Sequence, residues 1–133
     1  MRTPDSLSPI HITLIVGLGG FVGANARYWL ATLISAWVGR VYPWGTLLIN
    51  ITGSLLLGVF LAWASRRVSL DPQISLLIAV GFFGAYTTFS SFANESIALF
   101  QRGEWLPAVL YIVTTNLVCI LGAGLGTWIG SRL

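Results

Sequence analysis

Long apolar stretches alternate with short charged or polar segments along this chain. Charged residues are absent from four intervals, which are residues 6–26, 41–65, 72–94 and 105–131. A helix crosses the hydrocarbon of a bilayer in about 20 residues, so each interval is long enough to span it. A charge left at the bilayer centre costs at least about 2.5 kcal/mol, so charged positions mark the ends of spans. The pattern predicts an all-α integral membrane protein with four transmembrane helices.

The turns between the spans refine these limits. We expect helices at about residues 10–38, 44–65, 73–101 and 106–129, joined by short segments marked by Gly, Pro or Arg. Trp44, Trp63 and Trp105 fall near expected span ends, where amphipathic rings prefer the headgroup level. Because the connecting segments are too short to fold alone, we expect residues 1–133 to form a single transmembrane domain.

Composition agrees with this interpretation and narrows the function. Of 133 residues, 56% are hydrophobic and 8% are charged, far below the roughly 25% charged that soluble domains carry. The positive charges behind the net charge of +3 are all Arg and are scattered, so we expect no nucleic-acid binding. His11 stands alone and Cys119 is the single cysteine. With no catalytic set or metal cluster visible, we expect no enzyme.

The charges at the two ends of the spans are nearly balanced. One side of the membrane would collect Arg2, Arg66, Arg67 and Arg132. The other side would collect Arg40 and Arg102, with Arg27 as a further candidate. This difference is a weak orientation signal. Insertion in both directions would give an antiparallel homodimer with a two-fold axis in the membrane plane, whereas the paired arginines at 66–67 alone would set one orientation.

Small residues recur at four-residue intervals in the first and fourth helices. These residues are Gly19, Gly20 and Gly23 in the first helix and Gly122, Gly126 and Gly130 in the fourth. Such spacing lets the backbones of two helices approach closely. We interpret these glycines as packing positions.

Polar and small residues of the second helix share one face. Thr46, Asn50, Gly53 and Ser54 recur at intervals of three and four residues. An asparagine amide at this depth either joins helices through hydrogen bonds or donates to an ion that passes. The residues alone do not decide between these two roles for Asn50.

The third segment makes a poor continuous helix. Residues 81–92 read GFFGAYTTFSSF, with two glycines, adjacent threonines and paired serines. We therefore expect this helix to be broken near its centre. Non-helical backbone at this depth is tolerated only where protein buries it or where it lines a wet path. In such a path, freed carbonyls can hold a cation and freed N–H groups an anion.

Side chains around the expected break have two interpretations each. The hydroxyls of Thr88 and Ser91 either line such a path or bond back to their own helix. Phe89 and Phe92 are three residues apart, hence on one helical face. Their rings either pack against neighbours or turn a positive edge toward an anion.

A polar stripe and two isolated charges complete the candidates. Tyr111, Thr115 and Cys119 follow one another at i, i+4 spacing on the fourth helix, where they either line a pore or join helices. Glu95 and Arg27 are the charges nearest to a span interior. Snorkelling to the interface is the ordinary explanation for both.

Three motifs carry a family resemblance when they are taken in this order. They are GGFVGANARY at residues 19–28, WGTLLINITGS at residues 44–54, and the segment 81–92. Together they resemble the Fluc (CrcB) family of small fluoride channels over most of the chain. The resemblance implies passive, fluoride-selective efflux across the inner (plasma) membrane, which would protect the cell from fluoride toxicity. It also implies a dual-topology homodimer surrounded by membrane lipid.

The resemblance further implies roles for individual residues. The backbone carbonyls of Gly84 and Thr87 would hold a structural sodium ion at the dimer centre. The fluoride pore would comprise Asn50 as donor, Phe89 and Phe92 as ring-edge contacts, Tyr111, Thr115 and Cys119 as a polar track, Arg27 as the first-helix arginine and Glu95 as a vestibule glutamate. To these we add Thr88 and Ser91, from their place beside the expected break.

The chain departs from the family pattern at a few positions. Ala85 and Tyr86 replace a glycine and a leucine that are common in the break. Cys119 stands where a hydroxyl is often found, and a thiol is the weaker hydrogen-bond donor.

Two other classes of membrane protein compete with the channel. A small proton-coupled multidrug transporter would have a similar size and symmetry, but it needs a buried carboxylate in the first helix, and Asp5 precedes that helix. A structural membrane subunit would explain the glycines but not the polar third segment. Amide, hydroxyl and ring-edge donors are mild enough to release an ion, and no motif indicates energy coupling, so a passive pore suffices.

Overall fold

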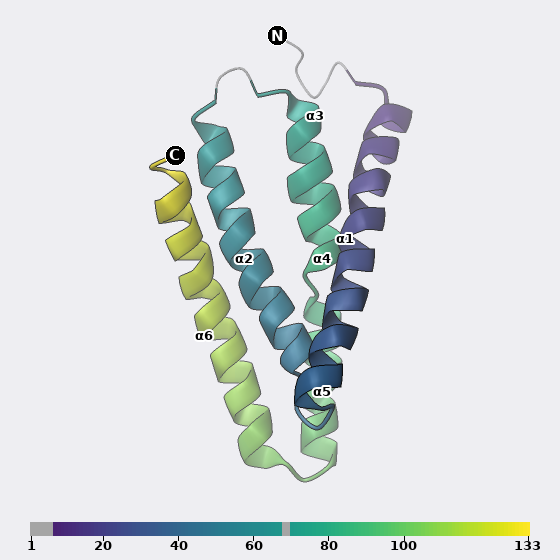
Figure 1. Ribbon diagram of the computed structural model, residues 1–133, viewed down its shortest axis with the longest axis vertical. Coiled ribbons are helices and arrows are strands. Elements are labelled where there is room, and N and C mark those ends of the chain that lie inside the picture. The colour runs from purple at the N-terminus through teal and green to yellow at the C-terminus, as the bar shows by residue number, and fades with distance from the viewer. Residues whose placement is uncertain (1–6, 68–69) are drawn as a thin grey trace.

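The computed structural model describes residues 7–67 and 70–133, and within these ranges every regular element is a helix. Arg2 and Asp5, which entered the charge balance and the comparison with transporters, lie outside the described residues. The elements in chain order are α1 (Pro9–Val38), α2 (Trp44–Ser65), α3 (Pro72–Ser75), the π-helical η2 (Leu76–Phe83), α4 (Gly84–Tyr86), α5 (Phe89–Gln101) and α6 (Trp105–Gly130) (Figure 1).

Four stretches are long and apolar enough to cross a membrane, which confirms the expectation of four membrane-capable helices in an all-α chain. They are Pro9–Val38, Trp44–Ser65, Pro72–Gln101 and Trp105–Gly130. The third stretch combines α3, η2, α4 and α5. Between α4 and α5 its backbone is extended, with ψ of 158° at Thr87 and φ of −151° at Thr88.

Local sequence explains where the spans begin and end. Ser8 caps α1 by accepting a hydrogen bond from the backbone N–H of His11 at 3.3 Å, and Pro9 suits the first turn because it has no N–H to satisfy. Gly39 follows the helix with a φ of 90°, which glycine adopts without steric cost. Asp71 and Pro72 start the third span in the same way, since the Asp71 carboxylate accepts from the N–H of Gln73 at 2.9 Å.

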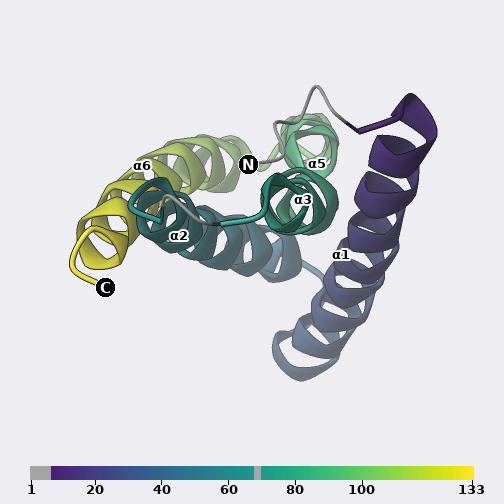
Figure 2. The same ribbon diagram turned by 90° about the horizontal axis from the view of Figure 1, so that it is seen from above.

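The spans form a splayed arrangement rather than a closed bundle. α2 lies along α6, and α1 lies along η2 and α4. Figure 1 shows α2 and the third span close together near α5 and farther apart toward α3, while Figure 2 shows α1 on the far side of the third span from α6. The start of α1, the end of α2, the start of α3 and the end of α6 lie at one end of the molecule.

Glycines make the two long helix interfaces possible. A Cβ on Gly19 or Gly23 would overlap a backbone carbonyl of η2, and a Cβ on Gly126 would overlap the Leu55 carbonyl of α2. Gly130 faces the Val59 carbonyl in the same way. The packing interpretation is confirmed for these four glycines. Gly20 and Gly122 have only ordinary contacts, the nearest at 3.9 and 3.7 Å from a Cβ built on each.

Two small apolar clusters hold the third span against its neighbours. One contains Leu47, Phe92, Leu99, Ala108 and Tyr111, and the other contains Ile49, Phe83 and Tyr86. Both therefore include residues of α2 and of the third span. Consecutive parts of α2 contact the segments before and after the extended residues, so this helix aligns both halves of the third span.

Candidate functional site

A pair of hydrogen bonds joins the Asn50 side chain to the extended backbone at Thr88. The Asn50 Nδ2 donates to the Thr88 carbonyl at 3.0 Å, and the Thr88 N–H donates to the Asn50 Oδ1 at 2.8 Å. Asn50 is only 9% exposed, so these bonds satisfy backbone groups that would be costly to leave unpaired. An Asn amide carries two N–H groups, and the second remains available to another acceptor.

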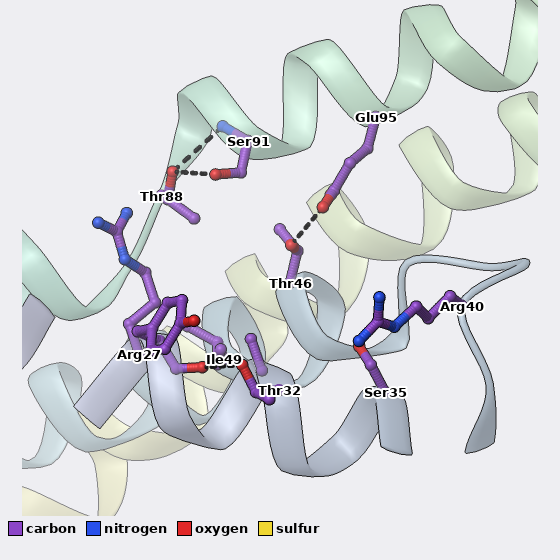
Figure 3. A pocket seen from close by; sticks show the side chains of 11 residues that line it. Arg27, Thr32, Ser35, Arg40, Thr46, Ile49, Thr88, Ser91 and Glu95 are labelled. Carbon is purple, nitrogen blue, oxygen red and sulfur yellow. Dashed lines mark hydrogen bonds between the residues drawn. The ribbon is translucent and has the colours of Figure 1, made fainter. Parts of the chain in front are cut away.

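The Thr88 side chain begins the next helix. Its Oγ1 accepts from the backbone N–H of Ser91 at 3.2 Å, which is an N-cap bond, and it donates to the Ser91 hydroxyl at 3.1 Å. Two roles were considered for the Thr88 and Ser91 hydroxyls, and the structure shows one of them, hydrogen bonding within their own segment at the start of α5. The same two residues also line a cavity (Figure 3).

Because the Thr88 N–H bonds to Asn50, the carbonyl four residues earlier, that of Gly84, is left without its helical donor. In a continuous α-helix the Thr88 N–H would donate to the Gly84 carbonyl, but here it donates to Asn50. The Thr87 N–H and hydroxyl both bond to the Phe83 carbonyl, at 3.1 and 2.9 Å. Gly84 is exposed, and a Cβ placed on it would meet nothing within 4 Å. Its carbonyl therefore loses its usual helical donor at an open position.

The first of two cavities, called here the inner cavity, lies beside Asn50 between α2, α5 and α6. Its volume is about 270 Å³. Its lining comprises Asn50, Ser54, Leu57, Thr87, Thr88, Phe89, Phe92, Thr115, Asn116, Cys119 and Ile120. No charged side chain belongs to this lining, and every polar group in it is an amide, a hydroxyl, a thiol or backbone.

Thr115 provides an unusual group in the inner cavity. The residue is 5% exposed, and its Oγ1 has no hydrogen-bond partner among residues 7–67 and 70–133. A buried polar atom without a partner costs about 1–3 kcal/mol, so most such atoms are paired. Thr115 therefore carries a buried hydroxyl without a described partner, at the wall of the inner cavity.

The two phenylalanines at the inner cavity differ in exposure. Their ring centroids are 5.5 Å apart with an interplanar angle of 56°. Phe92 is 7% exposed and packs on Tyr111, whereas Phe89 is 76% exposed. Packing thus accounts for Phe92, while the Phe89 ring lies at the surface of the single chain.

The second cavity, called here the outer cavity, meets the inner one at Thr88. Its volume is about 400 Å³. It is lined by Arg27, Tyr28, Ala31, Thr32, Ser35, Arg40, Thr46, Ile49, Thr88, Ser91 and Glu95. Figure 3 shows the Arg27 side chain extending from α1 toward Thr88, and the Arg40 side chain beside Ser35. The outer cavity thus contains two positive groups and one carboxylate.

Two hydroxyls hold the Glu95 carboxylate. Thr46 donates to one oxygen and Tyr111 to the other, each at 2.7 Å. Bonds of this length to a carboxylate are charge-assisted and favour a fixed orientation. Glu95 is therefore bound by α2 and α6 inside the helix assembly, an arrangement that simple snorkelling does not describe.

The structure groups the sequence candidates around these two cavities. Asn50, Phe89, Phe92, Thr115 and Cys119 line the inner cavity, Arg27, Ser91 and Glu95 line the outer one, and Thr88 lines both. Tyr111 lies on the stripe with Thr115 and Cys119 but lines neither cavity, because its hydroxyl bonds to Glu95. Gly84 also lines neither, while Thr87 reaches the inner cavity.

Sequence reasoning did not select several of the lining residues, among them Thr46 and Arg40. Thr46 was placed on the polar face of the second helix with Asn50, and this spacing was the signal that could have identified it. Arg40 was treated as a loop charge, and nothing in the local pattern places its side chain at the same cavity as Arg27. The described residues contain no group of three or more His, Cys, Asp or Glu that could hold a metal ion.

These features define a small, multi-pass helical protein of the cell membrane with neutral polar groups gathered between its helices. The family described as "CrcB-like protein, Camphor Resistance (CrcB)" matches residues 14–127. The chain belongs to this family.

Curated relatives cover most of the chain. A protein of Koribacter versatilis (strain Ellin345) named fluoride-specific ion channel FluC is 53% identical over 114 residues, which cover 84% of this chain and 90% of the relative. Proteins of the same name from Magnetococcus marinus and Chloroflexus aurantiacus are 42% and 38% identical. They match 86% and 88% of this chain and 94% and 96% of their own lengths.

Proposed function

We propose that this protein is a fluoride-selective channel, not an enzyme, and that it lets fluoride leave the cell passively and so limits fluoride toxicity. Membership of the CrcB family and the name of its relatives support the ion and the activity. The observation that carries the proposal is the inner cavity, which has no charged lining residue. Asn50, whose amide is held by two hydrogen bonds to Thr88, and Thr115, whose hydroxyl has no partner in the described part of the chain, both line it.

The chemistry of the inner cavity suits a small, strongly hydrated anion. Such an ion sheds water only where other donors replace it, yet it must not bind so tightly that it stays. The second N–H of Asn50, the Thr115 hydroxyl and the edge of the Phe89 ring are neutral donors of moderate strength. Arg27 and Arg40 lie in the outer cavity and not in the inner one, so their charge attracts anions without holding them beside Asn50.

Outward movement of fluoride in this proposal requires no energy input from the protein. With a negative cell interior, a potential of about 100 mV favours outward movement of one negative charge by about 2.3 kcal/mol. The buried carboxylate that a proton-coupled multidrug transporter needs in its first helix has no counterpart in α1, whose sequence contains no Asp or Glu. A structural subunit without transport would leave the unpaired Thr115 hydroxyl unexplained.

The working unit in this proposal is a dimer of two inverted copies. The open Gly84 backbone supports it, because a carbonyl that has lost its helical donor needs another partner in a membrane. The exposed Phe89 ring supports it as well, because it stands at the wall of the inner cavity. Within the described residues, Arg66, Arg67 and Arg132 lie at one end and Arg40 and Arg102 at the other, a difference too small to impose one orientation. A partner would then complete the wall of the inner cavity at Phe89.

A structural sodium ion at the centre of that dimer is a further part of the proposal. The Gly84 carbonyl, which loses its helical donor, and the Thr87 carbonyl in the extended segment are oxygen ligands of the type that hard cations accept. Two such pairs from inverted copies would converge on one ion, which would join the interrupted third spans by electrostatic attraction. The neutral carbonyls suit a monovalent cation.

Ion efflux from liposomes tests the function directly. Purified protein is reconstituted into vesicles loaded with fluoride or chloride, and release is followed with ion-selective electrodes after a potassium ionophore is added. We expect fast fluoride release and retained chloride. Equal release of both anions would remove selectivity from the proposal, and release no faster than in protein-free vesicles would remove the channel.

A further inference from the structure

A groove with a volume of about 560 Å³ separates the end of α2 from the start of the third span. We call it the α2–α3 groove. Its lining comprises Leu61, Ala64, Ser65, Arg67, Leu70, Pro72, Ser75, Leu76, Ala79 and Val80. None of these residues lines the inner or outer cavity, so the groove is separate from the proposed ion pathway.

The polar residues of the groove all lie at one end, where Leu70 and Pro72 also line it, and the other end is apolar. Ser65, Arg67 and Ser75 lie near the ends of their helices, at the edge of the membrane-spanning part. Leu61 lies about 6 Å further along α2 from Ser65, at a rise of about 1.5 Å per residue. On the opposite wall, Val80 lies deeper in the third span than Ser75. Polarity along the groove thus changes in the same direction as along a lipid, whose polar headgroup lies at the interface and whose apolar chains lie deeper in the membrane.

Arg67 is positioned to meet a negative headgroup. Its guanidinium lies over the Trp63 ring, 4.8 Å from the ring centroid, a stacking that orients the planar group while its N–H donors stay at the edge. Arg66 adds a second positive charge at the end of α2. The negative charge nearby, Asp71, is engaged as the cap of α3 through the N–H of Gln73.

We propose that the α2–α3 groove binds one anionic phospholipid. Its phosphate contacts Arg67 and the Ser65 and Ser75 hydroxyls, and one acyl chain lies along Leu61 and Val80. α2 and the third span diverge toward this end of the molecule (Figure 1), so the lipid fills space that the chain leaves open between two of its own helices. The occupant is a lipid because a free phosphate ion would leave the apolar half of the groove unfilled.

Native mass spectrometry of the purified, full-length protein with phosphatidylglycerol or phosphatidylcholine tests this site. We expect wild-type protein to retain phosphatidylglycerol in preference to phosphatidylcholine. Arg67→Gln should weaken retention of phosphatidylglycerol about fivefold, since one arginine near an anionic surface contributes about that factor, and should leave phosphatidylcholine unchanged. Arg132→Gln is the matched control, because Arg132 stacks on Trp128 at 3.8 Å near the same end but outside the groove.

A second variant tests the apolar half. Ala79→Trp places a large ring in the groove and should reduce retention of both lipids, with folding checked by gel filtration. If that variant does not fold, the comparison of Arg67→Gln with Arg132→Gln decides alone. Equal losses in those two variants would indicate general attraction of lipid to a positive surface and would overturn the proposed site. Unchanged retention in Arg67→Gln would also overturn it.

Discussion

At Asn50 one side chain serves both the fold and the proposed pathway. Its amide accepts from and donates to the backbone of Thr88, in place of the partners that a continuous helix would provide. The second N–H of the amide has no acceptor among residues 7–67 and 70–133, so it is available to an ion. The two roles considered from the sequence, helix joining and donation to an ion, are therefore compatible in one residue.

Replacing Asn50 with Asp should impair fluoride efflux at least about tenfold. The substitution removes the donor to the Thr88 carbonyl and places a negative group beside a passing anion, and one unfavourable contact of about 1.4 kcal/mol already gives a tenfold effect. Liposome efflux measures the rate. Asn94→Asp is the control, since Asn94 bonds to the Ser90 carbonyl of its own helix, lies beside Glu95 and lines neither cavity. Wild-type efflux in Asn50→Asp would exclude this amide from the pathway.

Thr115 should give opposite effects on stability and transport. Valine has nearly the same shape as threonine but lacks the buried, unpaired hydroxyl. We expect Thr115→Val to raise the free energy of unfolding by about 1 kcal/mol and to slow fluoride efflux severalfold. Thermal unfolding in detergent and liposome efflux measure the two effects.

A threonine on the same helix provides the control for this experiment. Thr127 donates its hydroxyl to the Ala123 carbonyl at 2.9 Å and lies outside both cavities, so Thr127→Val should leave efflux unchanged. A Thr115→Val protein that is less stable and transports at the normal rate would mean that the hydroxyl is only a packing group.

The helices pack on one another mainly through close contact between their backbones. α1 buries only Gly19 and Gly23, and both face backbone carbonyls of η2. The third span is π-helical over Leu76–Phe83, the segment that α1 contacts, and π-helical segments often lie near functional sites. Because lipid tails are as apolar as leucine, contact of this kind rather than exclusion of water holds these helices together.

Adding one methyl group at this contact should destabilise the protein. In Gly23→Ala the new Cβ would overlap the Phe82 carbonyl, and overpacking of this kind costs about 1–3 kcal/mol. Gly124→Ala is the control, because its Cβ would meet nothing within 4 Å and alanine favours the helix by up to about 1 kcal/mol. Thermal unfolding should therefore shift in opposite directions. A shift in the same direction would mean that the α1–η2 contact is not tight.

The positions of the helices were predictable because a membrane-spanning helix needs a long charge-free run, and such runs can be read directly from the sequence. The interval expected at about 44–65 corresponds to Trp44–Ser65, and the one expected at about 10–38 to Pro9–Val38. The charges set these limits locally, with no need of tertiary information. Capping by Ser8 and Asp71 adjusts the ends by about one residue.

The contacts of the candidate site were not predictable in the same way. Asn50 and Thr88 are 38 residues apart, and Thr46 and Glu95 are 49 apart, so their pairing depends on how the spans pack. The i, i+4 spacing of Tyr111 and Thr115 correctly placed both residues on one face of α6. It did not reveal that the Tyr111 hydroxyl would turn to Glu95 while that of Thr115 remains unpaired.

At the scale of the whole molecule, the apolar exterior and the small difference in charge between the two ends bear on one question, which is whether an inverted second copy covers part of the surface. Large apolar side chains such as Phe21 and Trp37 are exposed along α1, as expected for a chain surrounded by lipid. The exposed Phe89 ring differs from them because it also lines the inner cavity. A single copy would leave this cavity wall facing lipid, whereas an inverted second copy would cover it.

Positive charges added at one end of the protein should therefore force it to insert into the membrane in a single orientation. Ser131→Lys with Leu133→Lys strengthens one end, and Val41→Lys with Leu106→Lys strengthens the other, so each double variant should insert in a single direction. Each alone is expected to give fluoride efflux near that of empty vesicles, since it lacks inverted partners. Co-expression of the two should restore efflux, because inverted pairs can form again. If either biased variant alone transports as fast as the wild type, a single orientation suffices and the inverted dimer is wrong.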